Sequence, residues 1–433
     1  MAEKLLFLSA VLLVLLCSSL VVSVEAASMW SQTYGGSASD SARSLIKSSD
    51  GGYVLAGTWN YSYSEDAWLV KTDPLGNMLW NKTCGGTEQD GASSLIITSD
   101  GNYAMAGHTG SYGAGGSDFW LVKIDGFGNI DWNRTYGGKD DDYASSLIAT
   151  PDGGYALAGT WNYTTYYPGG VPFPVLHGDF WLVKTDASGV MQWNKTYGGN
   201  GDDGAVSLVV TSDGGYALTG YTRSFGAGSN DFWLMKTDAV GIMRWNKTYG
   251  GTSADFAYSL IETSDGGYAV VGTTMSFGAG GADFWLVKTD AFGNVQWNRT
   301  YGGTDNDMAT SVIASSDGGY VLAGQTRSFG AGSSDFWLVK TDALGNIQWN
   351  KTYGGTTDDA AISLVAASDG GFAIVGNTWS FGVGGDFWLV KTDEVGMVPE
   401  FSSWIVPTLV LAATATVLLN KKKILSHSRQ RAQ

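Results

Sequence analysis

The chain repeats one segment seven times, and this repetition restricts its fold more than any other feature. A Tyr-Gly-Gly triplet, or Cys-Gly-Gly in one copy, begins at Tyr34, Cys84, Tyr136, Tyr197, Tyr249, Tyr301 and Tyr353. The intervals between them are 50, 52, 61, 52, 52 and 52 residues. A fixed period of this length indicates one structural unit that is copied along the chain.

One copy, residues 249–300, contains four short apolar runs separated by turn signals. The runs cover residues 257–263, 268–273, 283–290 and 295–300. The first two are joined by Ser-Asp-Gly-Gly, whose glycines tolerate the positive φ of a tight turn. Four strands in about 52 residues, without helical periodicity, predict one four-stranded blade of a β-propeller.

Seven copies predict an all-β, seven-bladed propeller closed by its N-terminal strand. The last copy stops at Met397 without a Trp-Asn-Lys-Thr strand, and Trp30-Ser-Gln-Thr-Tyr34 near the start is an unpaired copy of that strand. We therefore expect residues 29–34 to complete the seventh blade, which removes free strand edges. An open solenoid of the same repeats is the alternative.

Composition and charge restrict the class of partner. The 433 residues include 62 Gly and 18 Trp, which fits many short strands joined by tight turns. The formal net charge is −16, and a cluster of cations lies after Asn420, so the repeats are more acidic than the whole chain. An acidic body argues against nucleic acid, whose binding depends on neutralised phosphates. The only cysteines, Cys17 and Cys84, cannot form a disulfide framework or a thiolate metal site.

Both ends carry apolar segments. Residues 5–24 are almost wholly apolar, and small residues before Ala27 suit a cleavage site, so residues 1–26 are predicted to be a signal peptide. An uncleaved anchor is the alternative. The propeller would then cover residues 27–397, a linker 398–403, a transmembrane helix 404–420 and a basic tail 421–433. Lys421–Lys423 predict a cytoplasmic tail and a propeller outside the cell.

Three motifs resemble known families. Pro399-Glu400-Phe401, followed by an apolar run and a basic tail, resembles the PEF-type C-terminal sorting signals of archaeal surface proteins. This implies cleavage by a sortase-like enzyme and attachment of another anchor. The Asp-x-x-Gly-Asn-x-x-Trp segment resembles the blade turn of quinoprotein-type propellers. Ser48-x-Asp50-x-Gly52 partly resembles the Asp-box hairpin of sialidase-type propellers, which stabilises a turn and implies no activity.

An aspartate follows each Gly-Gly pair at a fixed distance. These residues are Asp40, Asp90, Asp142, Asp203, Asp255, Asp307 and Asp359. If the strand that follows is innermost, the carboxylates ring one mouth of the central channel and could hold Ca²⁺. The alternative is that each aspartate accepts backbone N–H bonds in its own turn. No other cofactor is predicted.

A tryptophan lies two residues after another repeated aspartate, in the third strand of each copy. These residues are Trp68, Trp120, Trp181, Trp233, Trp285, Trp337 and Trp388. Large aromatic side chains at one position of every blade are expected to fill the space between blades.

The loop after the second strand differs most between copies, and binding faces of repeat proteins usually carry such variation. The candidate binding residues are His108, Tyr221, Arg223, Gln325, Arg327, Asn377 and Trp379, with Trp59, Trp161 and Met275 at related positions. The third copy inserts about nine residues here, around 166–174 and His177. Aromatic, Arg and amide side chains suit a carbohydrate or a protein partner. Neutral variation of an exposed loop is the alternative.

Eight sequons are candidate glycosylation sites in a secreted protein. They begin at Asn60, Asn81, Asn133, Asn162, Asn194, Asn246, Asn298 and Asn350. Six of them occupy the same position of the predicted outer strand, so a copied strand also explains them.

The sequence favours a surface-anchored, non-catalytic binding or adhesion module. Its expected partners are the membrane, through the C-terminal helix, and a glycan or an envelope protein, and not nucleic acid. An extracellular hydrolase or quinoprotein-like oxidoreductase with its site at the channel mouth is the alternative, and a purely structural envelope module is a third. No catalytic residue is assigned.

Overall fold

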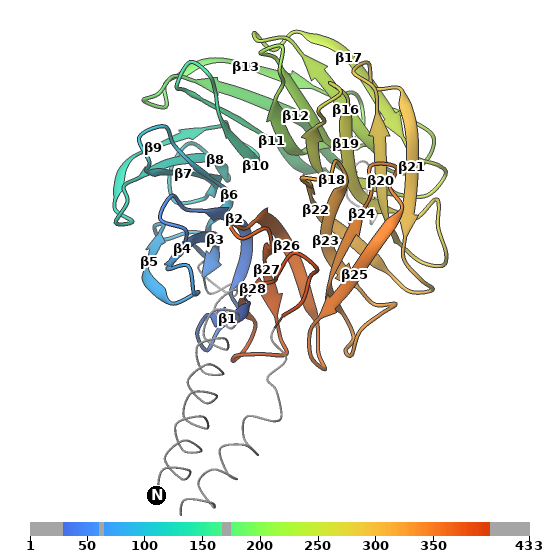
Figure 1. Ribbon diagram of the computed structural model, residues 1–433. Coiled ribbons are helices and arrows are strands. Elements are labelled where there is room, and N and C mark those ends of the chain that lie inside the picture. Colours follow the sequence, from blue (N-terminus) through green and yellow to red (C-terminus); the bar gives the residue numbers. More distant parts are fainter. Residues whose placement is uncertain (1–28, 60–64, 167–174, 399–433) are drawn as a thin grey trace, which may run out of the picture. The chain divides into compact units, whose positions relative to one another are not determined.

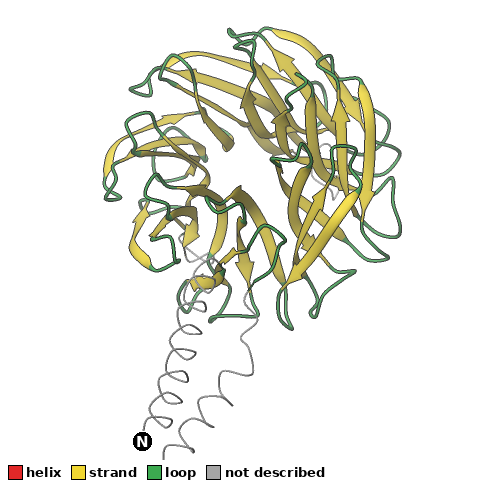
Figure 2. Ribbon diagram, in the orientation of Figure 1, coloured by secondary structure: helices red, strands yellow, loops and turns green. Residues whose placement is uncertain are grey.

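The computed structural model describes residues 29–59, 65–166 and 175–398, with only the backbone for 164–166 and 175–177. Residues 30–396 form one compact unit, built from strands and loops (Figure 2). A search of the described residues for an apolar helix long enough to cross a bilayer finds none. The expected signal peptide, transmembrane helix and basic tail, and also Asn60 and the insert at 167–174, lie outside the described residues.

The compact unit is a seven-bladed β-propeller, as the repeat predicts. Seven separate sheets of four antiparallel strands are arranged in a ring (Figure 1). In six blades the strands follow chain order from the centre outward, for example β18-β19-β20-β21. The innermost strands of neighbouring blades contact one another all the way round the ring.

The strands are named here by their place in the blade. The first, innermost strands are β2 (Ser41–Lys47), β6 (Asp90–Ile97), β10 (Asp141–Ala149), β14 (Asp203–Val210), β18 (Asp255–Glu262), β22 (Asp307–Ala314) and β26 (Asp359–Ala366). The second strands are β3 (Tyr53–Trp59), β7 (Tyr103–Thr109), β11 (Tyr155–Tyr166), β15 (Tyr216–Thr222), β19 (Tyr268–Thr274), β23 (Tyr320–Thr326) and β27 (Phe372–Thr378). The third strands are β4 (Asp66–Thr72), β8 (Asp118–Ile124), β12 (Val175–Thr185), β16 (Asp231–Thr237), β20 (Asp283–Thr289), β24 (Asp335–Thr341) and β28 (Asp386–Lys391). The fourth, outermost strands are β5 (Met78–Cys84), β9 (Ile130–Tyr136), β13 (Met191–Tyr197), β17 (Met243–Tyr249), β21 (Val295–Tyr301), β25 (Ile347–Tyr353) and β1 (Trp30–Tyr34).

The N-terminal strand closes the ring, as expected from the incomplete last repeat. Strand β1 is the outermost strand of the seventh blade, in the order β1-β28-β27-β26. Trp30 pairs with Lys391 and Tyr34 pairs with Phe387 along an antiparallel ladder. The first and last segments of the propeller therefore share one sheet.

The hydrophobic core lies between blades rather than within them. The cluster at the junction of blades 4 and 5, for example, joins Phe232 and Leu234 of one blade to Leu260, Tyr268 and Trp285 of the next. The third-strand tryptophans are buried, at 1–5% exposure, as predicted from their repetition. At six junctions a third-strand Phe packs on the Trp of the following blade, with ring centroids 4.4–4.7 Å apart.

The outer strand of each blade is fixed to the next blade by a second tryptophan. Trp245 packs edge-on against Tyr268 at 5.8 Å, and it covers Gly293 so closely that a Cβ there would lie 2.7 Å from the indole ring. At all seven junctions this tryptophan packs on an aromatic ring of the next blade, which is Tyr at six junctions and Phe372 at the seventh. At six of them a Tyr hydroxyl also donates to the carbonyl of the covered glycine at 2.6–2.7 Å, as Tyr249 does to Gly293.

The junction of blades 1 and 2 lacks several of these contacts. Ala67 replaces the packing Phe, and Cys84 replaces the Tyr that donates the hydrogen bond. The indole N–H of Trp120 has no partner, whereas five other third-strand tryptophans donate to an asparagine at 3.2–3.4 Å. Ile124, where most blades carry Thr, is buried in the same cluster as Cys84 and adds volume where the Tyr is missing.

We predict that Trp30→Ala destabilises the propeller as much as Trp245→Ala does. Both side chains are half-buried and pack on a Tyr of the next blade, at 5.9 and 5.8 Å. Truncating either should lower the free energy of unfolding by about 2 kcal/mol, which a denaturant titration measures. A loss for Trp245→Ala alone would show that the N-terminal strand does not close the ring in solution.

We also predict that Cys84→Tyr combined with Ile124→Thr stabilises the junction of blades 1 and 2 by about 1 kcal/mol, through a new buried hydrogen bond to Gly128. Cys84→Tyr alone should destabilise, because Ile124 fills the space that the ring needs. Melting temperatures of both single variants and the double variant test this. Equal effects with and without Ile124→Thr would contradict the compensation.

Candidate functional site

The two ends of the propeller are built differently. One end carries the Gly-Gly connections between blades and the longer loops between second and third strands, and it is called the loop face here. The other end carries the tight turns between first and second and between third and fourth strands, and it is called the turn face. The cavity described below opens at the loop face.

Each innermost strand contains a β-bulge at the same position. In blade 5, Ala257 pairs with Gly272 and Ser259 pairs with Val271, so Tyr258 has no partner across the ladder. An extra residue of this kind bends the strand and redirects a side chain. The bulge residues are Arg43, Ser93, Ser145, Val206, Tyr258, Thr310 and Ile362.

The residues on either side of the bulge are the same in every blade. The preceding residue is a buried Ala, and the following residue is a Ser. At four junctions this Ser hydroxyl accepts the N–H of an apolar residue in the next blade's first strand, as Ser259 does from Val312 at 3.3 Å. The neighbours thus fix the backbone, and the bulge residue itself can differ from blade to blade.

A second set of variable residues lies next to the bulges, in cross-strand pairs of the first and second strands. Gly91 pairs with His108, whereas Phe256 pairs with Thr273. A Cβ added to Gly91 would lie 2.6 Å from the His108 ring, so the small residue makes room for the large one. The pairs therefore vary together in size while the fold stays the same.

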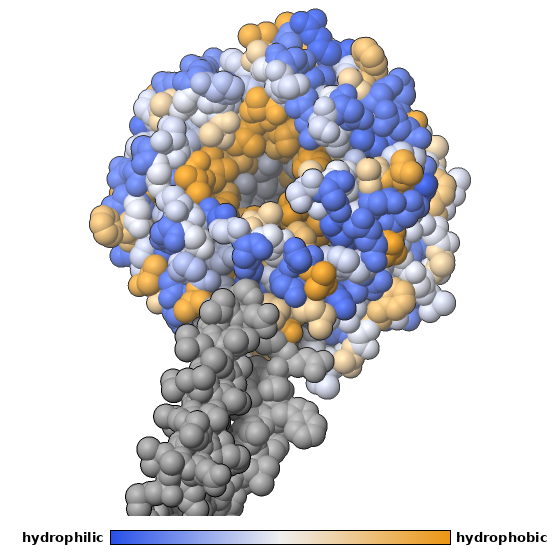
Figure 3. All heavy atoms as spheres, in the orientation of Figure 1, coloured by the Kyte–Doolittle hydropathy of each residue, from blue (hydrophilic) through white to orange (hydrophobic). Residues whose placement is uncertain are grey.

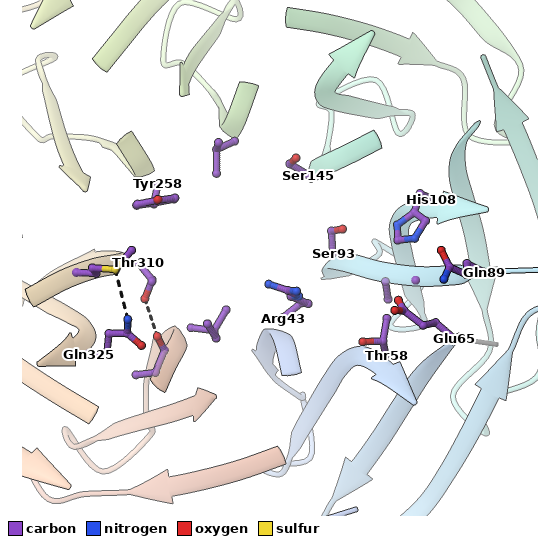
Figure 4. Close-up of a pocket in the computed structure, with 16 residues that line it drawn as sticks. Arg43, Thr58, Glu65, Gln89, Ser93, His108, Ser145, Tyr258, Thr310 and Gln325 are labelled. Carbon is purple, nitrogen blue, oxygen red and sulfur yellow. Dashed lines mark hydrogen bonds between the residues drawn. The ribbon is translucent and has the colours of Figure 1, made fainter. Parts of the chain in front are cut away.

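The seven bulge residues line a cavity of about 690 Å³ at the channel mouth, together with Gly91, His108, Met308 and Gln325 of these pairs. Figure 3, which views the ring from the end opposite to that of Figure 4, shows the central channel as a hollow with hydrophobic residues on its wall. Side chains from different blades, among them Arg43, Ser93, Ser145, Tyr258 and Thr310, point toward the same space (Figure 4).

The cavity wall has two unlike halves. Arg43, Ser93 and Ser145 come from three successive blades and make one half polar. The other bulge residues are Val206, Tyr258, Thr310 and Ile362, and they make the opposite half mainly apolar and aromatic.

Titratable groups cluster on the polar side, where Glu65 and His108 lie near Arg43 (Figure 4). Burial raises the pKa of the Glu65 carboxyl, and the Arg43 guanidinium lowers it in part. Burial lowers the pKa of the His108 imidazole, against the opposing effect of the Asp90 carboxylate. His108 is therefore neutral at pH 7, and Arg43 supplies the positive charge on this side of the cavity.

The candidate binding residues from the variable loops occupy different places. His108 and Gln325 line the cavity, and Gln325 donates to the Met308 sulfur at 3.3 Å. Tyr221 packs against Phe256 and bonds to Asp202 at 3.2 Å.

The remaining candidates lie outside the cavity. Arg223 and Arg327 are exposed, and the Arg223 guanidinium donates to Asn230 at 2.6 Å. Trp379 is 49% exposed on the loop face. Asn377 is buried, and its side-chain oxygen accepts the N–H of Ala42 at 2.7 Å, which joins blade 7 to blade 1.

The seven aspartates after the Gly-Gly pairs are buried in their own turns. Asp255 is 0% exposed, and its carboxylate accepts the N–H of Gly251 at 3.0 Å and the hydroxyl groups of Ser276 and Thr274. The equivalent glycine N–H bonds to Asp in all seven copies. Among the described residues, no three His, Cys, Asp or Glu side chains gather closely enough to hold a metal ion.

Close approach explains the first glycine of every connection and the second glycine of five of them. A Cβ added to Gly302 would lie 1.8 Å from a carboxylate oxygen of Asp283, and one added to Gly303 would lie 2.7 Å from the Cβ of Ser328. Neither position can hold a side chain while the third-strand aspartate and the loop serine stay in place.

The six outer-strand sequon asparagines are exposed, and five of them accept a hydrogen bond from a third-strand tryptophan, for example Asn246 from Trp233 at 3.3 Å. Asn162 is exposed in the loop of blade 3 and has a φ of 57°.

The bulge residues are the functional candidates that sequence reasoning missed. Their signal was present in the sequence, because one position inside an otherwise uniform Ala-x-Ser pattern differs in almost every copy. The loops vary more visibly, since they differ in length as well as in residue type.

We predict that Asp255→Ala lowers the free energy of unfolding by about 3 kcal/mol, since it leaves buried N–H and O–H donors without an acceptor. The loss should be the same with Ca²⁺ and with a chelator, as followed by thermal melting. Stabilisation of the unaltered protein by Ca²⁺ that disappears in Asp255→Ala would show instead that these carboxylates hold an ion.

The chain is only distantly similar to the known proteins that it matches. No protein-family model matches the chain. Over 196 residues, 41% of the chain, it is 28% identical to the regulatory protein FlaEY of Caulobacter vibrioides, and it spans about a fifth (20%) of that relative's length. Sqt1 from Chaetomium thermophilum shares 13% identity with a TM-score of 0.47, over 86% of this chain and 88% of that chain. The Pan2 WD40 domain of Neurospora crassa shares 10% identity with a TM-score of 0.49, over 83% and 91% of the two chains.

Proposed function

We propose that this protein is a non-catalytic binding module, displayed outside the cell, that takes a glycan or an envelope protein at the channel mouth of its loop face. A propeller fold suits a binding or regulatory module, and the matched relative is itself named a regulatory protein.

One observation carries the proposal: the blades differ from one another at the residues that line the cavity. The Asp, Gly, Trp and Ser residues that hold blades together recur in nearly every copy. The seven bulge positions instead carry Arg, Ser, Val, Tyr, Thr and Ile. A purely structural ring has no use for an asymmetric wall, whereas a site for one defined ligand requires one.

The chemistry of the wall suits an elongated polar ligand with an apolar face. Tyr258 offers an aromatic surface, and Arg43 with Ser93 and Ser145 offers hydrogen-bond donors on the other side. Carbohydrates and the side chains of a protein loop both present this combination of surfaces.

The display outside the cell is part of the proposal. It rests on residues 1–26, with their apolar stretch 5–24, as a signal peptide, on 404–420 as a transmembrane helix, and on the PEF-like motif at 399–401. Glycans on the outer-strand sequons, such as Asn246 and Asn298, fit the same location, since these side chains are exposed. Calcium at the aspartates of the Gly-Gly connections is the alternative to the structural role given them above, and the calcium melting experiment distinguishes the two.

We predict that Tyr258→Ala and Arg43→Ala each weaken binding of the ligand found by a glycan and envelope-protein array by about tenfold, as expected for central contact residues. Calorimetric titration of the full chain measures the affinity. Arg244→Ala is the matched control, because it removes the same charge from an exposed outer strand and should leave the affinity unchanged.

Two results would contradict this function. Release of a cleaved or oxidised product from the ligand would favour the enzyme alternative. Equal affinities of the unaltered chain, Tyr258→Ala and Arg43→Ala would place the binding surface elsewhere on the protein.

A further inference from the structure

The turns between third and fourth strands present apolar residues to solvent. In blade 1, the Asp73 carboxylate accepts the N–H groups of Leu75 and Asn77 at 2.8 and 2.9 Å, and Gly76 adopts a φ of 80°. Asp and Gly thus supply what the turn needs, and the residue at its tip, Leu75, is 49% exposed. The seven tip residues are Leu75, Phe127, Ser188, Val240, Phe292, Leu344 and Val395.

Six of the seven tips are apolar and strongly exposed. Their exposed fractions run from 49% at Leu75 to 77% at Phe127. The first residues of the adjoining outer strands add to them, at 37–46% exposure, and these are Met78, Ile130, Met191, Met243, Val295 and Ile347. These tips and strand starts are called the apolar rim here. Tight turns are normally polar, and large exposed apolar patches mark contact surfaces.

Copying of one blade does not account for the apolar rim. A copied turn would carry the same residue each time, whereas the tips carry Leu, Phe, Val and one Ser. The apolar character of the tips recurs, whereas the residue type does not. The surface that contacts the tips therefore requires apolar side chains and does not require side chains of one particular shape.

Charges near the apolar rim occur in both signs. Each turn contains an Asp, and a cation from the preceding blade's outer strand lies against the turn glycine at six junctions. A Cβ added to Gly128, for example, would lie 2.7 Å from the Cγ of Lys82, and one added to Gly189 would lie 2.9 Å from the Cγ of Arg134. A surface of this composition suits a neutral or zwitterionic layer better than a strongly charged one.

The path of the chain brings a bilayer close to this rim. The turn Asp393–Gly396 of blade 7 belongs to the rim, and the chain leaves the propeller there. Residues 398–403 separate it from the apolar run Trp404–Leu419. Six residues span at most about 20 Å even when fully extended, so a membrane that takes up this run lies within that distance of blade 7.

We propose that the apolar rim rests on the outer surface of the membrane, with its tips in the interfacial layer and the channel mouth turned away from the lipid. This rests on the anchoring in the proposed function. Seven tips spaced round a ring contact a plane together, which holds the propeller axis upright on a short tether.

The test uses the full chain in phosphatidylcholine vesicles, with a nitroxide label at Phe127→Cys on the rim or at Phe277→Cys on the loop face. Both sites are exposed, at 77% and 45%, and Cys17→Ser and Cys84→Ser remove other labelling sites. We expect the ratio of oxygen to nickel-chelate accessibility to be at least about threefold higher at 127 than at 277, as for a side chain in the lipid interface.

The outcomes distinguish the contact of the apolar rim with the membrane from the membrane anchor of the proposed function. A chain that floats with the vesicles while both labels stay open to the nickel chelate would overturn the rim contact and leave the anchor intact. A chain that does not float, with both labels in water, would overturn both. A label at 127 shielded from oxygen and from nickel alike would show that protein, such as a second copy of this chain, covers the rim.

Blade 3 supplies the matched variant. Its tip is Ser188, held by the same hydrogen bonds to Asp186, so serine is compatible with the turn. Changing Leu75, Val240, Phe292, Leu344 and Val395 to Ser should leave the melting temperature unchanged and lower the accessibility ratio at 127 to that at 277. An unchanged ratio in this folded variant would also overturn the rim contact.

Discussion

The fold depends on contacts between blades, because a single four-stranded sheet has no core of its own. Each blade buries its two faces against its two neighbours, and the clusters that result contain residues of both. The outer-strand tryptophans join neighbouring blades in the same way at the outer edge of the ring. Trp245, for example, packs on Tyr268 and Gly293 of the next blade. Closure by β1 then completes the last of these contacts, so no blade is left with an open face.

The turns and loops of the propeller account for much of its acidic composition. Four aspartates recur in each blade, and each has a structural role. Asp255 accepts donors of the Gly-Gly connection, and Asp283 accepts the N–H of Ala279 in the loop that precedes it. Asp265 pairs with buried Lys288, and Asp290 accepts N–H groups of the outer turn. A propeller has nearly as many turns and loops as strands, and aspartate is one of the side chains that hydrogen-bond turn backbones readily. Much of the negative charge therefore reflects the architecture and is no indication of a cationic partner.

The architecture could be predicted from the sequence because one segment of about 52 residues repeats along the chain. The four runs of one copy, the number of copies and the missing last strand together predicted the blades and the closing role of Trp30–Tyr34, and all were confirmed. The first strand starts at Asp255, two residues earlier than the apolar run suggested. The bulge at Tyr258 was missed for a physical reason: a bulge is a property of the register between two strands, and residue types alone do not give that register. Asn377 was predicted to be a binding residue because it varies between copies. Its amide is instead buried, and the side-chain oxygen accepts the N–H of Ala42.

Rotational repetition also determines what kind of surface each face can offer. A position that keeps its chemistry in every copy becomes a uniform ring, and a position that changes becomes an asymmetric one. The tips from Leu75 to Val395 approach the first kind, since six of the seven are apolar, and a nearly uniform apolar ring matches a partner with no lateral features, such as a lipid layer. The bulge residues from Arg43 to Ile362 are of the second kind, and an asymmetric wall can distinguish one orientation of a defined ligand from another. Because the two sets lie at opposite ends of the same blades, contact at the turn face leaves the channel mouth free to bind.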